Sequence, residues 1–464
     1  MVWNFQDSYT NLPSIFYKKV KPDLFNNKKL ILFNKDLANE IGLNFDKFDE
    51  NEICDILLGK KLTNKEFFSQ AYAGHQFGHF TILGDGRALL LGEHITKNNQ
   101  RLDIQLKGSG RTPYSRNGDG KAAMGPMIRE YIVSEAMHNL GIPSTRALAV
   151  IKTGENIIRE RIEPGAILVR VAKSHIRVGT FQFGSLLKKH KEFEDLINYT
   201  IDRLYPELIN TKNKYIKFFE KICESQINLI VEWMRVGFIH GVMNTDNMSL
   251  SGETIDYGPC AFLDIYNPKT VFSSIDRMGR YSFENQPKIS LWNLARFGET
   301  ILHLIDDNET KAIKIIEEIL NKYNEIFNLN WNIMMCKKLH LDLKNESENL
   351  NIIKEFLDLM HIHKLDFTNT FLKLENNTLD KNIFEKWKEK YDKLKLNKSF
   401  NINPTIIPRN HIIEKIIHNS YNNDFKLLYE FEKAIKKPYN INKNKIFHSQ
   451  PNDNEKVYQT YCGT

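Results

Sequence analysis

The sequence predicts an α+β protein in which a strand-rich region is followed by a long helical region. Short apolar segments separated by Gly-rich turns fill much of residues 66–185, as expected for strands. From about residue 285 onward apolar residues follow helical spacing, as Ile353 and Phe356 do within segment 347–362. A chain of 464 residues is long enough for more than one lobe. We predict an N-terminal extension at 1–65, a strand-rich lobe with Gly- and Arg-rich loops at 66–185, and a helical lobe at 186–464.

The elements of the strand-rich lobe follow a recognisable order. A turn at 84–87, strands at 88–95 and 101–107, a Gly/Arg-rich stretch at 108–121, a helix over 122–140 and strands at 146–153 and 166–174 succeed one another. Gly141 and Pro143 provide the helix end. This succession is typical of the N-terminal lobe of protein kinases, so we predict a two-lobed, protein-kinase-like fold with a helical C-terminal region.

Composition excludes several classes of function. Hydrophobic residues make up 41% and charged residues 26% of the chain, as in ordinary globular proteins. No segment approaches the roughly 18–20 apolar residues of a membrane helix, and the first residues lack a signal-peptide pattern. The net charge of +7 is too small for this length to predict nucleic-acid binding. We therefore expect neither a membrane nor a nucleic acid as a partner.

The five cysteines are odd in number and form no C-x-x-C pair. A disulfide scaffold or a zinc ribbon is not expected from such spacing. The prediction is a protein of the reducing cytoplasm.

Two features of the strand-rich lobe suggest phosphate binding. Gly84 and Gly86 let backbone N–H groups approach phosphate oxygens closely, and Arg87 adds a cation. Lys107 ends the tetrad Ile-Gln-Leu-Lys, which has the layout of the kinase strand that carries a phosphate-binding lysine. The alternatives are an ordinary hairpin turn and a solvated strand lysine.

The helix and loop after Lys107 extend this interpretation. Glu130 is a candidate ion-pair partner for Lys107, as in the Lys–Glu pair of kinases. Glu135 on the same helix is an alternative partner that helical periodicity does not exclude. The stretch 108–121 has the composition of an anion-binding nest, with a flexible surface loop as the alternative.

Residues 238–259 carry the most specific pattern. Kinases have H-R-D or H-G-D, an Asn five residues after that Asp, a short hairpin and then an Asp-containing motif. Here Asn247 and Asp256 stand at the matching distances and are predicted to bind Mg²⁺ or Mn²⁺ through oxygen. Val242 occupies the place of the kinase base and cannot accept a proton. Asp246 is the only nearby carboxylate that could replace it.

Long segments of the sequence resemble the selenoprotein O family, which are kinase-like protein adenylyltransferases. The matching segments are 12–22, 71–93, 103–150, 169–183, 238–259 and 282–297. The resemblance implies a pseudokinase that binds ATP in a flipped orientation, transfers AMP to Ser, Thr or Tyr hydroxyls of proteins, and releases pyrophosphate. Some members are similar in using UTP with Mn²⁺, which implies UMP transfer as a further activity.

The resemblance also implies roles for individual residues. It implies Asp246 as proton acceptor, Asn247 and Asp256 as metal ligands, and Glu130 as the partner of Lys107. The implied nucleotide contacts are Gly84, Gly86, Arg87, Lys107, Asp119, Gly120, Arg170, Arg177 and Asp256. Members often end in a selenocysteine or cysteine, so redox control through Cys462 is a hypothesis. A true kinase with Asp246 as base and a non-catalytic nucleotide-binding pseudokinase remain the alternative functions.

Overall fold

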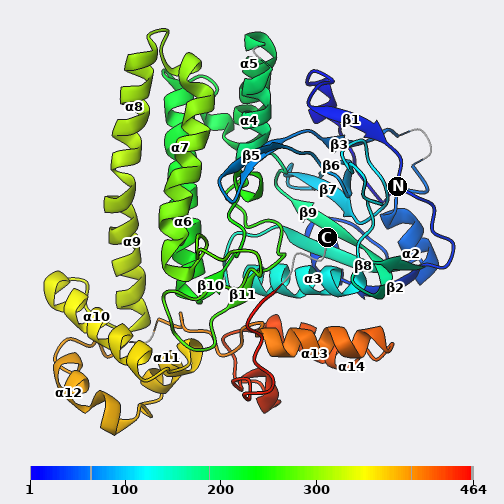
Figure 1. Ribbon diagram of the computed structural model, residues 1–464. Coiled ribbons are helices and arrows are strands. Elements are labelled where there is room, and N and C mark those ends of the chain that lie inside the picture. The colour runs from blue at the N-terminus through cyan, green and yellow to red at the C-terminus, as the bar shows by residue number, and fades with distance from the viewer. Residues whose placement is uncertain (1, 63–64, 188, 399, 461–464) are drawn as a thin grey trace.

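The computed structural model describes residues 2–460, apart from 63–64, 188 and 399. It shows a mixed α+β protein built on a seven-stranded antiparallel sheet with the strand order β1-β3-β6-β7-β9-β8-β2 (Figure 1). The strands of this sheet are β1 (Tyr17–Val20), β2 (Lys29–Phe33), β3 (Phe67–Gln70), β6 (Ala88–Ile95), β7 (Arg101–Lys107), β8 (Arg146–Ile158) and β9 (Ile162–Ala172). Two small sheets pair β4 (Ala73–Gln76) with β5 (His79–Ile82) and β10 (Phe238–Ile239) with β11 (Ala261–Phe262).

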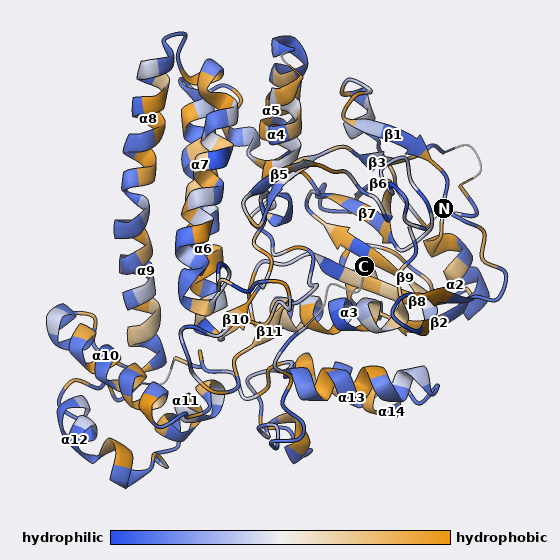
Figure 2. Ribbon diagram, in the orientation of Figure 1, coloured by the Kyte–Doolittle hydropathy of each residue, from blue (hydrophilic) through white to orange (hydrophobic). Residues whose placement is uncertain are grey.

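The described helices occupy the chain around and after the sheet. They are α1 (Lys35–Glu40), α2 (Glu50–Leu57), α3 (Met124–Asn139), α4 (Val178–Leu186), α5 (His190–Leu204), α6 (Lys214–Arg235), α7 (Gln286–Ile305), α8 (Glu309–Asn321), α9 (Tyr323–Lys338), α10 (Glu346–Ile362), α11 (Phe367–Glu375), α12 (Lys381–Tyr391), α13 (Asn410–Tyr421) and α14 (Lys426–Ile435). Figure 2 shows hydrophobic stripes along several of them, as expected where one face packs inward. Among these helices, none has the length and apolar character needed to span a bilayer.

The central elements of the sheet confirm the sequence prediction. Strands β6 and β7 and helix α3 lie where the pattern placed them, and β8 and β9 are longer than expected. Residues 1–65, predicted as an N-terminal extension, supply both edge strands, because β1 pairs with β3 and β2 pairs with β8.

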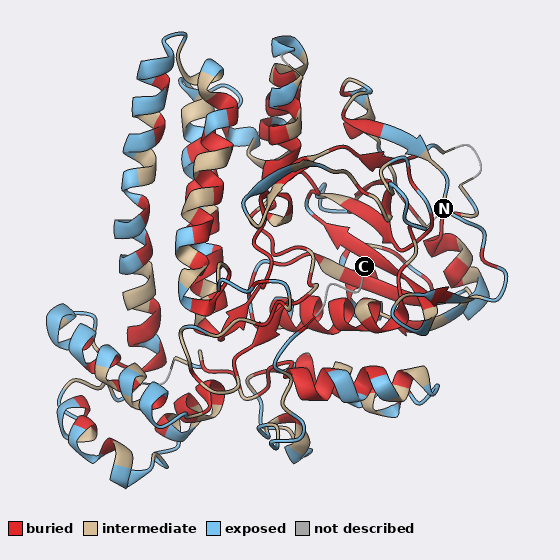
Figure 3. Cartoon of the chain, viewed as in Figure 1, coloured by how far each residue is buried: buried red, intermediate tan, exposed pale blue. Residues whose placement is uncertain are grey.

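The sheet is covered on both faces. Leu89, Leu91 and Ile104 point into a core shared with α1 and α2. Leu90 and Leu168, which face the other way, join the core of α3. Helix α3 is buried along nearly its whole length, since α13 and α14 pack against it (Figure 3). The C-terminal part of the chain therefore returns to the sheet region.

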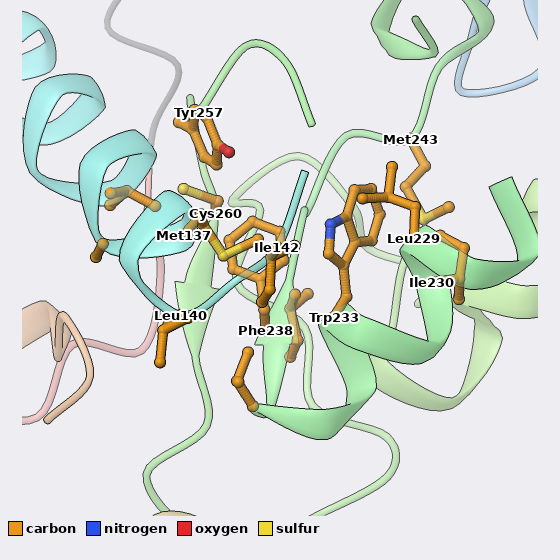
Figure 4. Close-up of a cluster of buried hydrophobic side chains, with 14 of the residues drawn as sticks. Met137, Leu140, Ile142, Leu229, Ile230, Trp233, Phe238, Met243, Tyr257 and Cys260 are labelled. Carbon is orange, nitrogen blue, oxygen red and sulfur yellow. The ribbon is translucent and has the colours of Figure 1, made fainter. Parts of the chain in front are cut away.

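Segment 238–260 runs between the sheet region and the helices and is anchored by a buried apolar cluster (Figure 4). Met137 of α3, Trp233 of α6 and Phe238 belong to this cluster. Trp233 Nε1 also donates a hydrogen bond to Thr254 Oγ1 at 2.8 Å. Cys260 is fully buried there and packs as a core thiol. The cluster fixes both ends of the segment that carries the predicted catalytic and metal-binding side chains.

Candidate active site

A cavity of about 950 Å³ brings the predicted site residues together. It is lined by Gly84, Gly86, Arg87, Lys107, Asp119, Gly120, Arg170, Arg177, Asp246, Asn247 and Asp256. These residues come from the turn before β6, from β7, β9 and the loop after β7, from the residue that precedes α4, and from segment 238–260. Glu130 lies behind Lys107 and lines a neighbouring cavity of about 930 Å³.

Lys107 stands at the centre of a buried ionic network. Its Nζ lies 2.7 Å from Glu130 Oε2 and 2.8 Å from Asp256 Oδ1. Arg170 contacts the same two carboxylates, with Nη2 at 2.7 Å from Asp256 Oδ1 and Nε at 3.0 Å from Glu130 Oε1. Lys107 is only 6% exposed, so the interpretation of a solvated strand lysine is wrong. Glu135 instead pairs with Arg146, which settles the choice between the two glutamates.

Arg177 completes the network from the N-terminus of α4. Its Nη1 lies 3.2 Å from Asp256 Oδ2 and donates to the backbone oxygen of Asp246 at 2.8 Å. The guanidinium lies 4.5 Å from the ring centroid of Tyr72. The network thus holds more cations (Lys107, Arg170, Arg177) than carboxylates (Glu130, Asp256), and its surplus positive charge faces the cavity.

The two carboxylates of the network are held ionised. Burial opposes the charge of Asp256, but Lys107, Arg170 and Arg177 outweigh it and keep the pKa well below its usual value. Burial likewise opposes the charge of Glu130, and Arg170 and Lys107 lower its pKa. Asp256 adopts a left-handed backbone conformation with φ +62°, which is uncommon for a residue other than glycine.

Asp246 has the opposite electrostatic character. It is 6% exposed, and burial raises the pKa of its carboxyl to about 6. Its Oδ2 accepts a hydrogen bond from Gln76 Nε2 at 3.2 Å, and its Oδ1 has no hydrogen-bond partner among the described residues. A carboxylate with a pKa close to neutrality is suited to accept a proton.

Small and polar residues of β4 shape the site around Asp246. A Cβ on Gly74 would lie 2.3 Å from Asp246 Oδ1, so only glycine leaves room for this carboxylate. The backbone N–H of His75 donates to Thr245 Oγ1 at 2.7 Å, which ties the loop of Asp246 to β4. His75 and His79 lie on the paired strands β4 and β5.

Oxygen ligands suited to a hard divalent cation face the same cavity. Asn247 Nδ2 donates to the backbone oxygen of Val242 at 2.9 Å, which leaves its Oδ1 as an acceptor. Asp256 adds carboxylate oxygens at the same cavity. No group of three or more His, Cys, Asp or Glu side chains poised to hold a metal occurs in the described part of the chain. The donor set fits Mg²⁺ or Mn²⁺ if phosphate and water complete the coordination.

The Gly-rich loops form the outer wall of the cavity. The turn at Gly84–Arg87 links β5 to β6, which belong to different sheets, so it is not an ordinary hairpin turn. Gly84 has φ +147°, and a Cβ there would lie 2.4 Å from the ring of Tyr114. Asp119 forms an ion pair with Arg159 at 2.8 Å, at the exposed side of the loop.

Segment 248–254 stands where kinases have a short hairpin, but it does not pair with itself. Instead, Ser249 bridges to Arg177 immediately before α4, and Thr254 bridges to Ser144 in the segment between α3 and β8.

Gln76 and Tyr72 are among the residues lining the cavity that were not predicted from the sequence. Gln76 contacts Asp246, and its only sequence signal is its place in the stretch Ala-Gly-His-Gln-Phe-Gly. Tyr72, which supports Arg177, carries no local signal. Cys462, the predicted redox residue, lies outside the described residues.

Comparison with known proteins agrees with this site. The family model described as "Protein adenylyltransferase SelO" matches residues 1–436. The chain is 50% identical to the protein nucleotidyltransferase YdiU of Pelagibacter ubique, over 100% of this chain and 99% of that protein. It is 48% identical to the YdiU of Halalkalibacterium halodurans and 47% identical to that of Clostridium perfringens strain SM101, in each case over 100% of this chain and 98% of the relative. The chain belongs to the SelO family of protein adenylyltransferases.

Proposed function

We propose that the protein transfers AMP from ATP to Ser, Thr or Tyr hydroxyls of other proteins on a two-lobed pseudokinase scaffold. The observation that carries this proposal is the pairing of a cationic network with a separate buried carboxylate in one cavity. Val242 replaces the base of a kinase, whereas Asp246 lies nearby with a pKa raised by burial to about 6. The proposed base lies at a different position from the base of a kinase. This difference fits an acceptor hydroxyl that attacks the α-phosphorus and not the γ-phosphorus of ATP.

The cationic network is the proposed site of the outer phosphates. Lys107, Arg170 and Arg177 present the surplus charge that a triphosphate would neutralise. The glycine turn at 84–86, Arg87 and the Gly120 loop line the same cavity and are proposed to contact the nucleotide with Asp119. ATP held this way is flipped relative to a kinase and turns its α-phosphorus toward Asp246.

Asp246 is the proposed proton acceptor. The acceptor hydroxyl loses its proton to the Asp246 carboxylate as its oxygen bonds to the α-phosphorus. The bond between that phosphorus and the bridging oxygen breaks, and pyrophosphate leaves with the electron pair. Lys107, Arg170 and Arg177 stabilise the charge that develops on the leaving group.

A bound divalent cation would add charge neutralisation at the phosphates. Asn247 and Asp256 are the residues that would hold it, and both Mg²⁺ and Mn²⁺ suit their oxygen ligands. UTP in place of ATP would give UMP transfer by the same chemistry. The four described cysteines are buried and free, which supports a cytoplasmic location.

The position of the label tests the proposal. Protein acceptors incubated with the enzyme should gain label from α-³²P-ATP and none from γ-³²P-ATP, and α-³²P-UTP measures UMP transfer. Label from the γ position alone would support a kinase, and tight nucleotide binding without any product would support a non-catalytic pseudokinase. Asp246→Asn should lose transfer, whereas Asp358→Asn on the exposed side of α10 should keep it.

A further inference from the structure

An aromatic and basic surface lies beside the cavity and has no part in the chemistry described above. We call it the Trp292 patch and define it as His75 of β4, Phe80 of β5, Arg280, and Trp292 and Arg296 of α7. The His75 ring lies 5.0 Å from that of Phe80 and 5.2 Å from that of Trp292. Figure 1 shows β5 reaching toward α4 and α7, so segments distant in the sequence build this surface together.

Two guanidinium groups share the Trp292 ring. Arg280 lies 4.7 Å and Arg296 lies 5.2 Å from the ring centroid. Such stacking holds an arginine in place while leaving its N–H donors available. Arg296 pairs with Glu299, but Arg280 has no carboxylate within ion-pair distance in the part of the chain that the structure describes.

Further basic side chains lie near the patch, together with the exposed carboxylates Glu284 and Glu299. Lys288, one helical turn before Trp292 on α7, is exposed, and so is Arg277 next to the patch in the chain. Burial lowers the pKa of His75, and Arg296 and Arg280 lower it further. A carboxylate arriving here would therefore meet excess positive charge.

Apolar side chains border the same surface. Phe80 is 43% exposed, Ile82 is 60% exposed and Met278 is 92% exposed. Exposed apolar residues beside a cationic aromatic patch are typical of an interaction site. None of the five patch residues lines the nucleotide cavity, so the nucleotide does not account for them.

The patch is directly connected to the proposed proton acceptor. His75 holds the loop of Asp246 through Thr245, and the next residue, Gln76, bonds to Asp246 itself. The Phe77 ring contacts Tyr281, whose hydroxyl donates to Asn244 Oδ1 at 2.6 Å on the cavity wall. An acceptor chain that presents its hydroxyl to Asp246 would thus pass close to Trp292.

We propose that the Trp292 patch docks acidic segments of the protein that receives the nucleotide. This inference rests on the proposed function and names its substrate class, a hydroxyl side chain flanked by Asp or Glu with apolar residues nearby. Arg280 supplies the unpaired charge, and Phe80 and Trp292 supply the apolar surface. A polypeptide is favoured over a nucleic acid because the patch adjoins the group that receives the hydroxyl proton.

Two peptides with the same Tyr acceptor test the proposal, one flanked by Asp and Glu and the other by Lys and Arg. The unaltered protein should prefer the acidic peptide. In the double variant Arg280→Glu/Arg296→Glu, kcat/KM for the acidic peptide should fall by about tenfold or more, mainly through a higher KM. The same variant should improve the basic peptide. Arg280→Lys/Arg296→Lys keeps the charge and should retain much of the preference. The control variant Lys354→Glu/Lys386→Glu makes an equal charge change on exposed residues of α10 and α12. This variant should leave the preference for the acidic peptide unchanged.

Fluorescence anisotropy of the labelled peptides measures docking without any transfer step. If the acidic preference in binding persists while no acceptor gains label, the proposed function fails and the docking surface stands. Equal binding of both peptides, or an equal loss of both in the charge-reversed variant, would overturn the docking proposal. Displacement of the acidic peptide by a polythymidine oligonucleotide that binds more tightly would also overturn it, in favour of a nucleic-acid surface.

Discussion

The side-chain amide of Gln76 donates a hydrogen bond to the carboxylate of Asp246 at 3.2 Å. Burial raises the pKa of Asp246 to about 6, and this bond partly offsets the rise because it favours the ionised form. The two residues come from β4 and from the loop after β10, and their contact is the largest of the effects that lower the pKa of the proposed base against burial.

Removing the Gln76 amide should shift the pH dependence of transfer. Asp246 accepts a proton only when ionised, so the rate of the unaltered protein should fall as the pH drops through about 6. In Gln76→Leu the pKa of Asp246 rises further, and the acid limb of kcat/KM against pH should move to higher pH. Activity at pH 7 should fall and partly recover at pH 8. An acid limb that stays in place would show that Asp246 is not the group that titrates.

Neutralising Asp246 should stabilise the fold while abolishing transfer. The folded-state pKa is raised from 3.8 to about 6, so this group contributes stability below about pH 4 that is lost as the pH rises through about 6. Asp246→Asn cannot ionise and removes this cost, which is roughly 2–3 kcal/mol for a shift of this size. Thermal unfolding at pH 8 should show a Tm higher by a few degrees, and the gain should vanish at pH 4. An unchanged or lower Tm at pH 8 would contradict the cost assigned to burial.

A methyl group on Gly74 should displace the proposed base. A Cβ there would lie 2.3 Å from Asp246 Oδ1, so Gly74→Ala forces the carboxylate or its loop to move. Transfer should fall sharply, whereas most of the ATP binding should be kept, because Lys107 and Arg170 pair with Glu130 and Asp256 and not with Asp246. Gly141→Ala is the control, since a Cβ at that position meets nothing within 4 Å and its positive φ costs stability only. Equal activities of the two variants, corrected for folding, would refute a steric role for Gly74.

Charge removal at the cationic network should impair phosphate stabilisation. Lys107→Ala removes one of the two cations that Glu130 and Asp256 share and leaves Arg170 as the other, and transfer should fall by about 10²-fold or more. Asp256→Ala removes the carboxylate that Lys107, Arg170 and Arg177 share, together with a proposed metal ligand, and should abolish transfer. Steady-state kinetics over a range of Mg²⁺ and Mn²⁺ concentrations measures both effects. Lys354→Ala, on the exposed face of α10, should match the unaltered protein, and rates within a few-fold of it for either site variant would mean that the site is misassigned.

Local patterns predicted the central strands β6 to β9 and helix α3 of the sheet region, but they did not predict the edge strands β1 and β2. The order of strands, turn and helix placed Lys107 and a helical glutamate together, and the spacing in 238–259 placed Asn247 and Asp256 in one segment. They could not decide between Glu130 and Glu135. The two residues are five positions apart and face different sides of α3, and packing against β8, β9 and α13 sets which side meets Lys107.

The sequence by itself determined which groups are present: a lysine at the end of a strand, an Asn and an Asp at the spacing of kinase metal ligands, and a valine where a kinase has its base. Only the tertiary structure decided which groups meet, because contacts between distant segments depend on how helices and sheets pack. Gln76 is separated from Asp246 by 170 positions, and Arg280 and His75 meet at Trp292 from three separate segments. The burial that raises the pKa of Asp246 is likewise a property of the folded cavity and has no counterpart in the extended chain.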